Sequence, residues 1–331
     1  MNPAEAPNEV FSVTAWVIFN IFVLAMLALD LGVFNRKAHT IKFKEALGWT
    51  ILWVTLAMGF NAWLYYDHGP EIGHEFLMGY ILEKSLSVDN IFVFIMLFTY
   101  FKIEPKYQHR LLFWGILGAL ILRGIMIAAG AALIYKFAWV LYIFGAFLIF
   151  TGIKMALHDD ENADPSNSIV YRYAKKFLPV AEGDYGQRFF VKIDGKTYVT
   201  TLFVVLLVIE TTDVVFALDS IPAIFGVTTN TFIIYTSNVF AILGLRAMYF
   251  MLAGVMDLFR YLKYGLSLVL VFVGCKMIVQ HAYKDGYLDQ QYITTNMSLA
   301  VIASIIALSI ILSLLFAKRE DHKKELEHDN D

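Results

Sequence analysis

Two acidic stretches, each inside a long apolar segment, hold the residues of this chain that are best suited to chemistry. The first is EKSLSVDNI at 83–91 and the second is DVVFALDSI at 213–221. In each stretch an acid is followed six residues later by an aspartate, then by a small amide or hydroxyl residue and an isoleucine. Carboxylates at membrane depth are costly, and where they occur they mark a pathway for ions or protons. The two stretches therefore predict a site that binds a cation or relays protons.

The candidate ligands of this site carry carboxylate, amide or hydroxyl oxygens. They are Glu83, Asp89, Asn90, Glu210, Asp213, Asp219 and Ser220. Oxygen ligands suit hard cations such as Mg²⁺, Ca²⁺ or Mn²⁺. The eight histidines fall in loops, at span ends or in the tail, and the chain has one cysteine, so zinc and copper are disfavoured. The oxygen ligands alone leave the choice among Mn²⁺, Ca²⁺ and Mg²⁺ open.

Three basic residues are predicted to balance these acids. Arg123 and Arg246 fall near the middle of their apolar segments, where a buried charge needs a partner, and Lys84 is adjacent to Glu83. We expect the two arginines to neutralise the empty site and to shift when a metal enters. The acids still outnumber these cations, and the negative surplus favours a cation as the ligand.

The spacing within each stretch restricts how one ion could reach both acids. Residues six apart on a straight helix differ by about 240° in direction. One ion would face both only if a helix were interrupted, or if the two stretches met with Asp89 opposite Asp219. Pro222 predicts a break in the second helix, because proline lacks a donor and clashes with the preceding turn. The hypothesis is that Asp89 and Asp219 form the core of a site at mid-membrane depth.

The composition is that of an integral membrane protein. Of the 331 residues, 59% are hydrophobic and 17% charged, and the mean hydropathy is +0.62. A soluble domain would have about 25% charged residues. Apolar runs long enough to span a bilayer predict nine transmembrane helices, at 10–34, 47–66, 76–101, 111–135, 138–157, 200–226, 231–254, 262–281 and 293–317. We therefore expect a polytopic all-α membrane protein.

Lys and Arg concentrate in alternate connections, namely 35–46, 101–110, 158–199, 255–263 and the tail after 317. Basic loops stay in the cytoplasm, which predicts an N-terminus outside and a C-terminus inside. Only 158–199 is long enough for structure outside the membrane, and alternating apolar residues around Asp194-Gly195 predict a β-hairpin there.

The chain contains an internal repeat. The acidic stretches match, Arg123 matches Arg246, and Gly152-Ile-Lys-Met matches Gly274-Cys-Lys-Met in the same order. Each copy holds three spans, so the second should insert upside down relative to the first, as in secondary transporters. The predicted division is 1–70 with two helices, 71–157 and 200–282 as the repeats, 158–199 as a cytoplasmic loop, and 283–331 as the last helix and tail.

The chain resembles the TerC family of integral membrane proteins, and within it the Alx-like branch. The resemblance is carried by EKSLSVDNIFV at 83–93, ETTDVVFALDSIPA at 210–223, TSNVFAILGLRAMYF at 236–250 and GCKM at 274–277. It implies a manganese exporter of the bacterial inner membrane, with Mn²⁺ as the transported substrate and no prosthetic group. The family's intramembrane acids would correspond to Glu83, Asp89, Glu210, Asp213 and Asp219.

The expected function is export of a divalent cation, with proton exchange through the same carboxylates as a driving force. The expected partners are the metal ion and membrane lipid, and no nucleic acid. Two further alternatives are a membrane scaffold or stress sensor that moves no ions, and a Ca²⁺ transporter. An intramembrane hydrolase with an Asp pair is a third, but the repeat does not support it and we expect no enzymatic activity.

Overall fold

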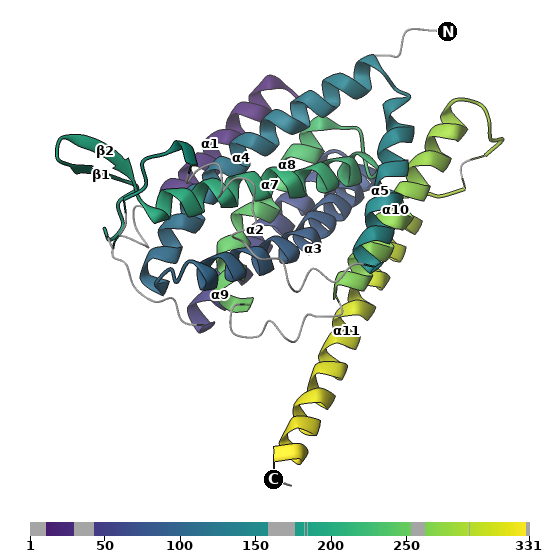
Figure 1. The fold of residues 1–331 in the computed structure, drawn as a ribbon. Helices are drawn as coiled ribbons and strands as arrows, with labels where there is room; N and C mark the ends of the chain where they lie inside the picture. Colours follow the sequence, from purple (N-terminus) through teal and green to yellow (C-terminus); the bar gives the residue numbers. More distant parts are fainter. Residues whose placement is uncertain are drawn as a thin grey trace.

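The fold is a bundle of long apolar helices with one small hairpin at its edge (Figure 1). The structure is a computed structural model that describes residues 11–29, 43–157, 176–181, 183, 185–252, 262–290 and 292–328. Residues 30–42, 158–175 and 253–261, which include parts of the predicted basic loops, and both chain ends lie outside the described residues. The elements are α1 (Val13–Leu29), α2 (Phe43–Asp67), α3 (Pro70–Tyr100), α4 (Pro105–Lys136), α5 (Val140–Leu157), β1 (Phe190–Ile193), β2 (Lys196–Val199), α7 (Thr201–Phe225), α8 (Thr231–Leu243), α9 (Leu245–Leu252), α10 (Leu262–Lys284) and α11 (Thr295–His328).

Every predicted span coincides with helix in the described residues, which confirms the polytopic all-α class. Seven helical segments are long and apolar enough to cross a membrane, with α8 and α9 counted together. The shorter α1 is apolar throughout. Helix α3 is long enough to cross, but Glu83, Lys84 and Asp89 interrupt its apolar sequence.

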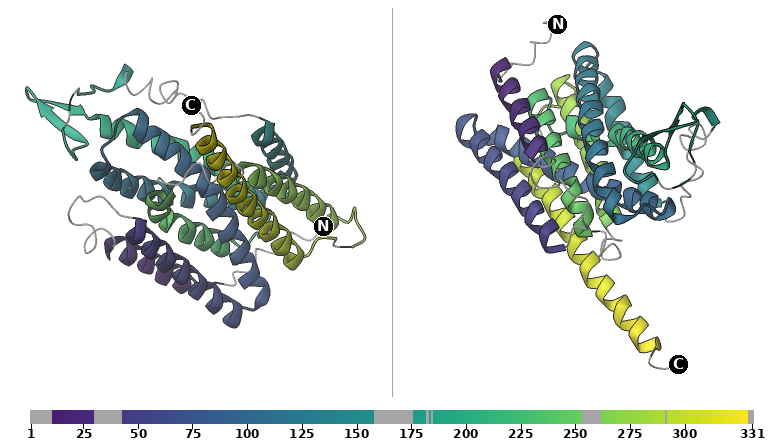
Figure 2. Two further views of the ribbon diagram at one scale, coloured as in Figure 1. Left: turned by 90° about the horizontal axis from the view of Figure 1, so that it is seen from below. Right: turned by 90° about the vertical axis from the view of Figure 1, so that its left-hand side faces the viewer.

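The outward faces of these helices are apolar. Ile18, Ile21 and Leu24 are exposed on α1, and Ile121 and Ile125 on α4. A soluble protein does not leave such continuous apolar surface open to water, whereas lipid tails solvate it well. Helix α11 presents Leu308, Ile311, Leu312 and Leu315 outward before it extends past the other helices (Figures 1 and 2).

The hairpin predicted around Asp194-Gly195 is present. β1 and β2 pair antiparallel, with Ile193 opposite Lys196, and both turn residues have positive φ, 49° for Asp194 and 77° for Gly195. Positive φ at both central residues is the geometry of a tight primed turn, which asparagine, aspartate and glycine tolerate. The hairpin protrudes at one edge of the bundle (Figure 2).

Contacts across the bundle give the relative directions of three central helices, α3, α4 and α7. Gly79 of α3 lies against Ile224 of α7, and Asn90 of α3 hydrogen-bonds Asp213 of α7. The later residue of α3 contacts the earlier residue of α7, so these two helices are antiparallel. Helix α4 runs parallel to α7, because Gly115 contacts Ile209 and Gly130 contacts Phe225.

Glycines let α5 and α10 approach each other very closely. A Cβ added at Gly274 would lie 2.6 Å from the Gly145 carbonyl oxygen, and one at Gly152 would lie 2.8 Å from the Ser267 carbonyl oxygen. Ser267 Oγ also donates a hydrogen bond to the Gly152 carbonyl. Small residues that bring backbones together are a main means of packing helices in lipid. The two contact points also show that α5 and α10 are antiparallel.

When the two repeat copies are aligned, each of the two contacts between α5 and α10 corresponds to the other. Gly152 aligns with Gly274, which places Gly145 at Ser267, so the Gly145–Gly274 contact becomes the Gly152–Ser267 contact. Antiparallel α3 with α7 and α5 with α10 is the arrangement that inverted copies would produce. The inverted relation of the whole copies stays a prediction.

The break predicted at Pro222 is wrong. Helix α7 continues through Pro222 and ends at Phe225. A proline this close to a helix end removes one backbone hydrogen bond and leaves the following turn in place. The interruption falls instead at Gly244, which separates α8 from α9.

Replacing Gly274 with alanine should destabilise the protein, because the added methyl group meets the Gly145 backbone, which is not free to move aside. We expect overpacking to cost about 1–3 kcal/mol, seen as a lower melting temperature in detergent. Gly59→Ala is the matched control, since nothing lies within 4 Å of a Cβ on this exposed residue of α2. Equal melting temperatures for the two variants would contradict the glycine contact.

Candidate functional site

Arg123 of α4 lies between two carboxylates contributed by other helices. Its Nη1 bonds Glu83 Oε1 of α3, while its Nε and Nη2 bond the two oxygens of Asp213 of α7 at 3.1 and 2.9 Å. The contact with Asp213 is therefore bidentate, the strongest form of an arginine–carboxylate pair. The side chains of Arg123 and Glu83 are only 3% and 2% exposed, so the ion pair between them is buried.

Two asparagines complete the hydrogen bonds of these carboxylates. Asn238 Nδ2 of α8 donates to Glu83 Oε2 at 2.9 Å, and Asn90 Nδ2 of α3 donates to Asp213 Oδ1 at 3.4 Å. Asn238 Oδ1 also accepts from Arg123 Nη1 at 3.5 Å. Every carboxylate oxygen of the cluster thus has a donor. We call Glu83, Asn90, Arg123, Asp213 and Asn238 the arginine cluster.

The cluster is held by the helices that the central contacts arrange. Helix α3 supplies Glu83 and Asn90, about two turns apart on the side that meets α7 and α8. Parallel packing of α4 beside α7 brings Arg123 to the level of Asp213. Two carboxylates and one guanidinium leave a formal surplus of one negative charge among these side chains.

A cavity of about 270 Å³ opens beside the cluster, and we call it the Asp219 cavity. Glu83, Asn90 and Arg123 form part of its wall, and Asp219 and Ser220 of α7 form another. Lys154 at the end of α5 also lines it, and its ammonium attracts the Asp219 carboxylate. Ser220 Oγ is buried without a hydrogen-bond partner among the described residues. The cavity thus presents a carboxylate and an unused hydroxyl next to the arginine cluster.

The other predicted site residues lie elsewhere. Glu210 lies at the α4–α7 contact against Gly118, and its Oε2 is buried without a partner in the described part of the chain. Lys84 Nζ donates to the Ala241 carbonyl at 3.0 Å, near the end of α8, where a cation favours the negative end of the helix. Arg246 is buried in the first turn of α9. Asp89 belongs to α3, but its side chain lies outside the described residues.

In this state the carboxylates are arranged for an arginine and not for a metal ion. Among the described side chains, no group of three or more His, Cys, Asp or Glu could hold a metal. Asp213 offers both oxygens to Arg123, and both oxygens of Glu83 are occupied. A cation could take these oxygens only by displacing the guanidinium, which makes Arg123 a competitor for the same negative charge.

Sequence reasoning missed two residues of the site. Asn238 lies within the TSNVFAILGLRAMYF motif, but an asparagine in an apolar helix alone does not reveal its partner 155 positions away. Lys154 belongs to the repeated Gly-x-Lys-Met motif, and its repetition was the available signal. Its place in the cavity wall follows only from the packing of α5 beside α7.

The fold and this buried charge cluster define a polytopic helical membrane protein with ionisable groups inside its bundle. The sequence profile described as "Integral membrane protein TerC family" matches residues 68–322. The chain therefore belongs to the TerC family.

Similar proteins cover nearly the whole chain. A membrane protein of Myxococcus xanthus, STKORF319, is 52% identical over 91% of this chain and 92% of its own length. Proteins of Salmonella typhi and Escherichia coli K12 are each 45% identical over 96% of this chain, covering 98% and 99% of their own lengths. Both carry the name Alx and a provisional description as membrane-bound redox modulators. No solved structure matches the chain significantly.

Replacing Arg123 with methionine should strongly destabilise the protein, because two buried carboxylates lose their cation. Breaking a buried pair on one side costs about 3–5 kcal/mol, and gel filtration and thermal melting in detergent would detect this loss. Arg188→Met, at an exposed arginine before the hairpin, is the matched control.

The triple variant Arg123→Met, Glu83→Gln, Asp213→Asn should recover most of the lost stability, because no unpaired charge remains. This variant keeps the prediction testable if Arg123→Met alone fails to fold. A triple variant no more stable than the single one would show that Arg123 acts through its shape and not through its charge.

Proposed function

We propose that this protein moves a divalent cation across the membrane through the Asp219 cavity, with Mn²⁺ as the substrate and the cytoplasm as the side of entry. The observation that carries the proposal is Arg123, held between Glu83 and Asp213 in the wall of a cavity that also contains Asp219. A cation transporter without its substrate needs a positively charged side chain, such as Arg123, in its acidic site. Unpaired buried carboxylates would otherwise be too costly to maintain.

The proposed cycle is an exchange of cations at one set of oxygens. A divalent ion enters beside Asp219 and Ser220, takes oxygens from Glu83 and Asp213, and the guanidinium of Arg123 moves away. Departure of the ion on the other side returns Arg123 to its partners. Because hard oxygen ligands accept Mn²⁺, Ca²⁺ and Mg²⁺ alike, the choice of Mn²⁺ and of export rests on the family resemblance.

The direction also requires an orientation in the membrane. The resemblance to the TerC family implies the bacterial inner membrane, and the basic loops predict an N-terminus outside and a C-terminus in the cytoplasm. In this orientation the C-terminal end of α5, with Lys154, lies toward the cytoplasm. The Asp219 cavity would therefore be the entrance from the cytoplasm.

Two other functions make different demands on these residues. An aspartic hydrolase needs two carboxylates that share a proton, whereas both Asp213 oxygens bond Arg123. The similar Alx proteins are named as redox modulators, and this chain has a single cysteine, Cys275, with no second thiol to close an internal disulfide. A scaffold or sensor that moves no ions remains the alternative, and ion flux separates it from a transporter.

Asp219→Asn should weaken Mn²⁺ binding at least about tenfold, which corresponds to about 1.4 kcal/mol, and should slow Mn²⁺ flux. Asp219 lies in the cavity wall outside the arginine cluster, so the variant should still fold. Titration calorimetry with MnCl₂, CaCl₂ and MgCl₂ and flux into proteoliposomes are the measurements. The control is Glu104→Gln, an exposed carboxylate paired with Lys106 between α3 and α4.

The transport proposal fails if the wild-type protein carries none of the three ions in proteoliposomes. Binding without flux would favour a sensor. Unchanged binding and flux in Asp219→Asn would remove the Asp219 cavity from the path, even if the protein is a transporter.

A further inference from the structure

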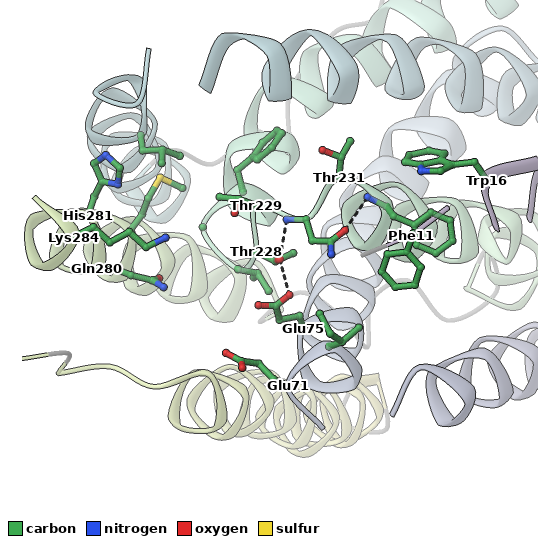
Figure 3. A pocket seen from close by; sticks show the side chains of 18 of the residues that line it. Phe11, Trp16, Glu71, Glu75, Thr228, Thr229, Thr231, Gln280, His281 and Lys284 are labelled. Atoms are coloured by element: carbon green, nitrogen blue, oxygen red, sulfur yellow. Dashed lines mark hydrogen bonds between the residues drawn. The ribbon is translucent and has the colours of Figure 1, made fainter. Parts of the chain in front are cut away.

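A second cavity of about 610 Å³ lies toward the opposite end of the bundle, and we call it the Glu75 cavity. Its wall includes Glu71 and Glu75 of α3, Met277 of α10 and Thr228 after α7 (Figure 3). Thr228 Oγ1 donates to Glu75 Oε2 at 2.6 Å.

The separation of the two cavities can be measured along α5. Leu141, in the first turn of α5, lines the Glu75 cavity, whereas Lys154, in the last turn, lines the Asp219 cavity. At 1.5 Å per residue these positions are about 20 Å apart. The cavities therefore approach the middle of the bundle from opposite ends.

The repeat relates the walls of the two cavities. Lys154 and Met155 of α5 align with Lys276 and Met277 of α10. Met155 lines the Asp219 cavity and Met277 lines the Glu75 cavity. Since α5 and α10 are antiparallel, each matched Lys-Met pair faces its own end of the bundle.

The two matched lysines nevertheless have different environments. Lys154 is exposed at its cavity and attracts Asp219. Lys276 is only 2% exposed, next to Met277 in the cavity wall, and its ammonium and the Glu75 carboxylate attract each other. Glu75 is in turn held by Thr228. The lysine at one cavity is thus exposed, whereas its counterpart near the other cavity is buried.

A buried ammonium inside a membrane protein is costly and is expected to have a function. Lys154 lies in the last turn of α5, where a lysine can extend its ammonium to water. Lys276 lies about two turns inside α10, too far for the same escape. The depth of Lys276 within α10 explains why its ammonium is buried. It does not explain why this position holds a lysine and not an apolar residue.

We propose that Lys154 and Lys276 are alternating counter-ions that gate the two cavities. In the state described here, Lys154 is exposed and Lys276 is buried. In the opposite state the two environments exchange: Lys276 enters the open Glu75 cavity and Lys154 becomes buried. The gate serves the proposed transport function, because entry of a divalent ion beside Asp219 removes the attraction that holds Lys154 in place.

The reactivity of the native lysines tests this gate. Full-length protein in detergent is treated with a water-soluble amine-acetylating reagent, without metal and with saturating MnCl₂, and mass spectrometry gives the rate at each lysine. Lys196 of the exposed hairpin is the open reference. Lys84, which bonds the Ala241 carbonyl inside the bundle, is the control for a lysine that does not move.

Without metal, Lys154 should react nearly as fast as Lys196, and Lys276 as slowly as Lys84. With Mn²⁺ we expect the rate at Lys276 to rise about tenfold and that at Lys154 to fall, as in a two-state population shift. Lys84 and Lys196 should not change. Asp219→Asn should raise the rate at Lys276 in the absence of metal, because Lys154 then loses its partner.

The gate is overturned if Lys276 stays as unreactive as Lys84 both with Mn²⁺ and in Asp219→Asn. It is also overturned if Lys154 and Lys276 change in the same direction. A wild-type protein that binds no Mn²⁺ would instead refute the proposed function, and the metal-free Asp219→Asn comparison would still decide whether the lysines exchange.

Discussion

The structure depends on one buried arginine that pairs with two buried carboxylates. Glu83 and Asp213 come from different helices and different repeat copies, and Arg123 from a third helix bonds both. Removing Arg123 leaves both carboxylates without a cation in a medium of low polarity. The ion pairs therefore set the relative level of α3, α4 and α7, and the same oxygens are the ones that a cation would need. In the proposed transport cycle, the stability of the empty protein and its affinity for an ion would therefore depend on the same atoms and oppose each other.

Glycine contacts provide the second constraint, because they hold α5 against α10 at a distance that larger residues would not allow. These helices carry Lys154 and Lys276, and the pair extends between the two cavities. A close, smooth contact between backbones in lipid relies on packing and not on the hydrophobic effect. It can therefore fix the pair as one rigid body while the lysines change their surroundings.

Membership in the TerC family and the geometry of the arginine cluster both support an integral membrane protein with ionisable groups inside its helical bundle. The family profile covers both acidic stretches, both arginines and both lysines of the repeat. The cluster itself is built from carboxylates, amides and a guanidinium. In the proposed transport cycle these groups would exchange cations without a change of oxidation state.

The sequence by itself determined the membrane class, the approximate helices and the hairpin, because hydropathy, helix length and turn chemistry are local properties. It also identified Glu83, Asp213 and Arg123 as buried charges that require partners. Only the tertiary structure decided which charges meet, because pairing depends on helix direction and level: Arg123 joins Glu83 and Asp213, Lys84 caps α8, and Glu210 lies apart at Gly118. Local sequence patterns also did not predict that α7 continues through Pro222, or that Lys154 and Lys276 have different environments. Each of these features depends on the neighbours that pack around it.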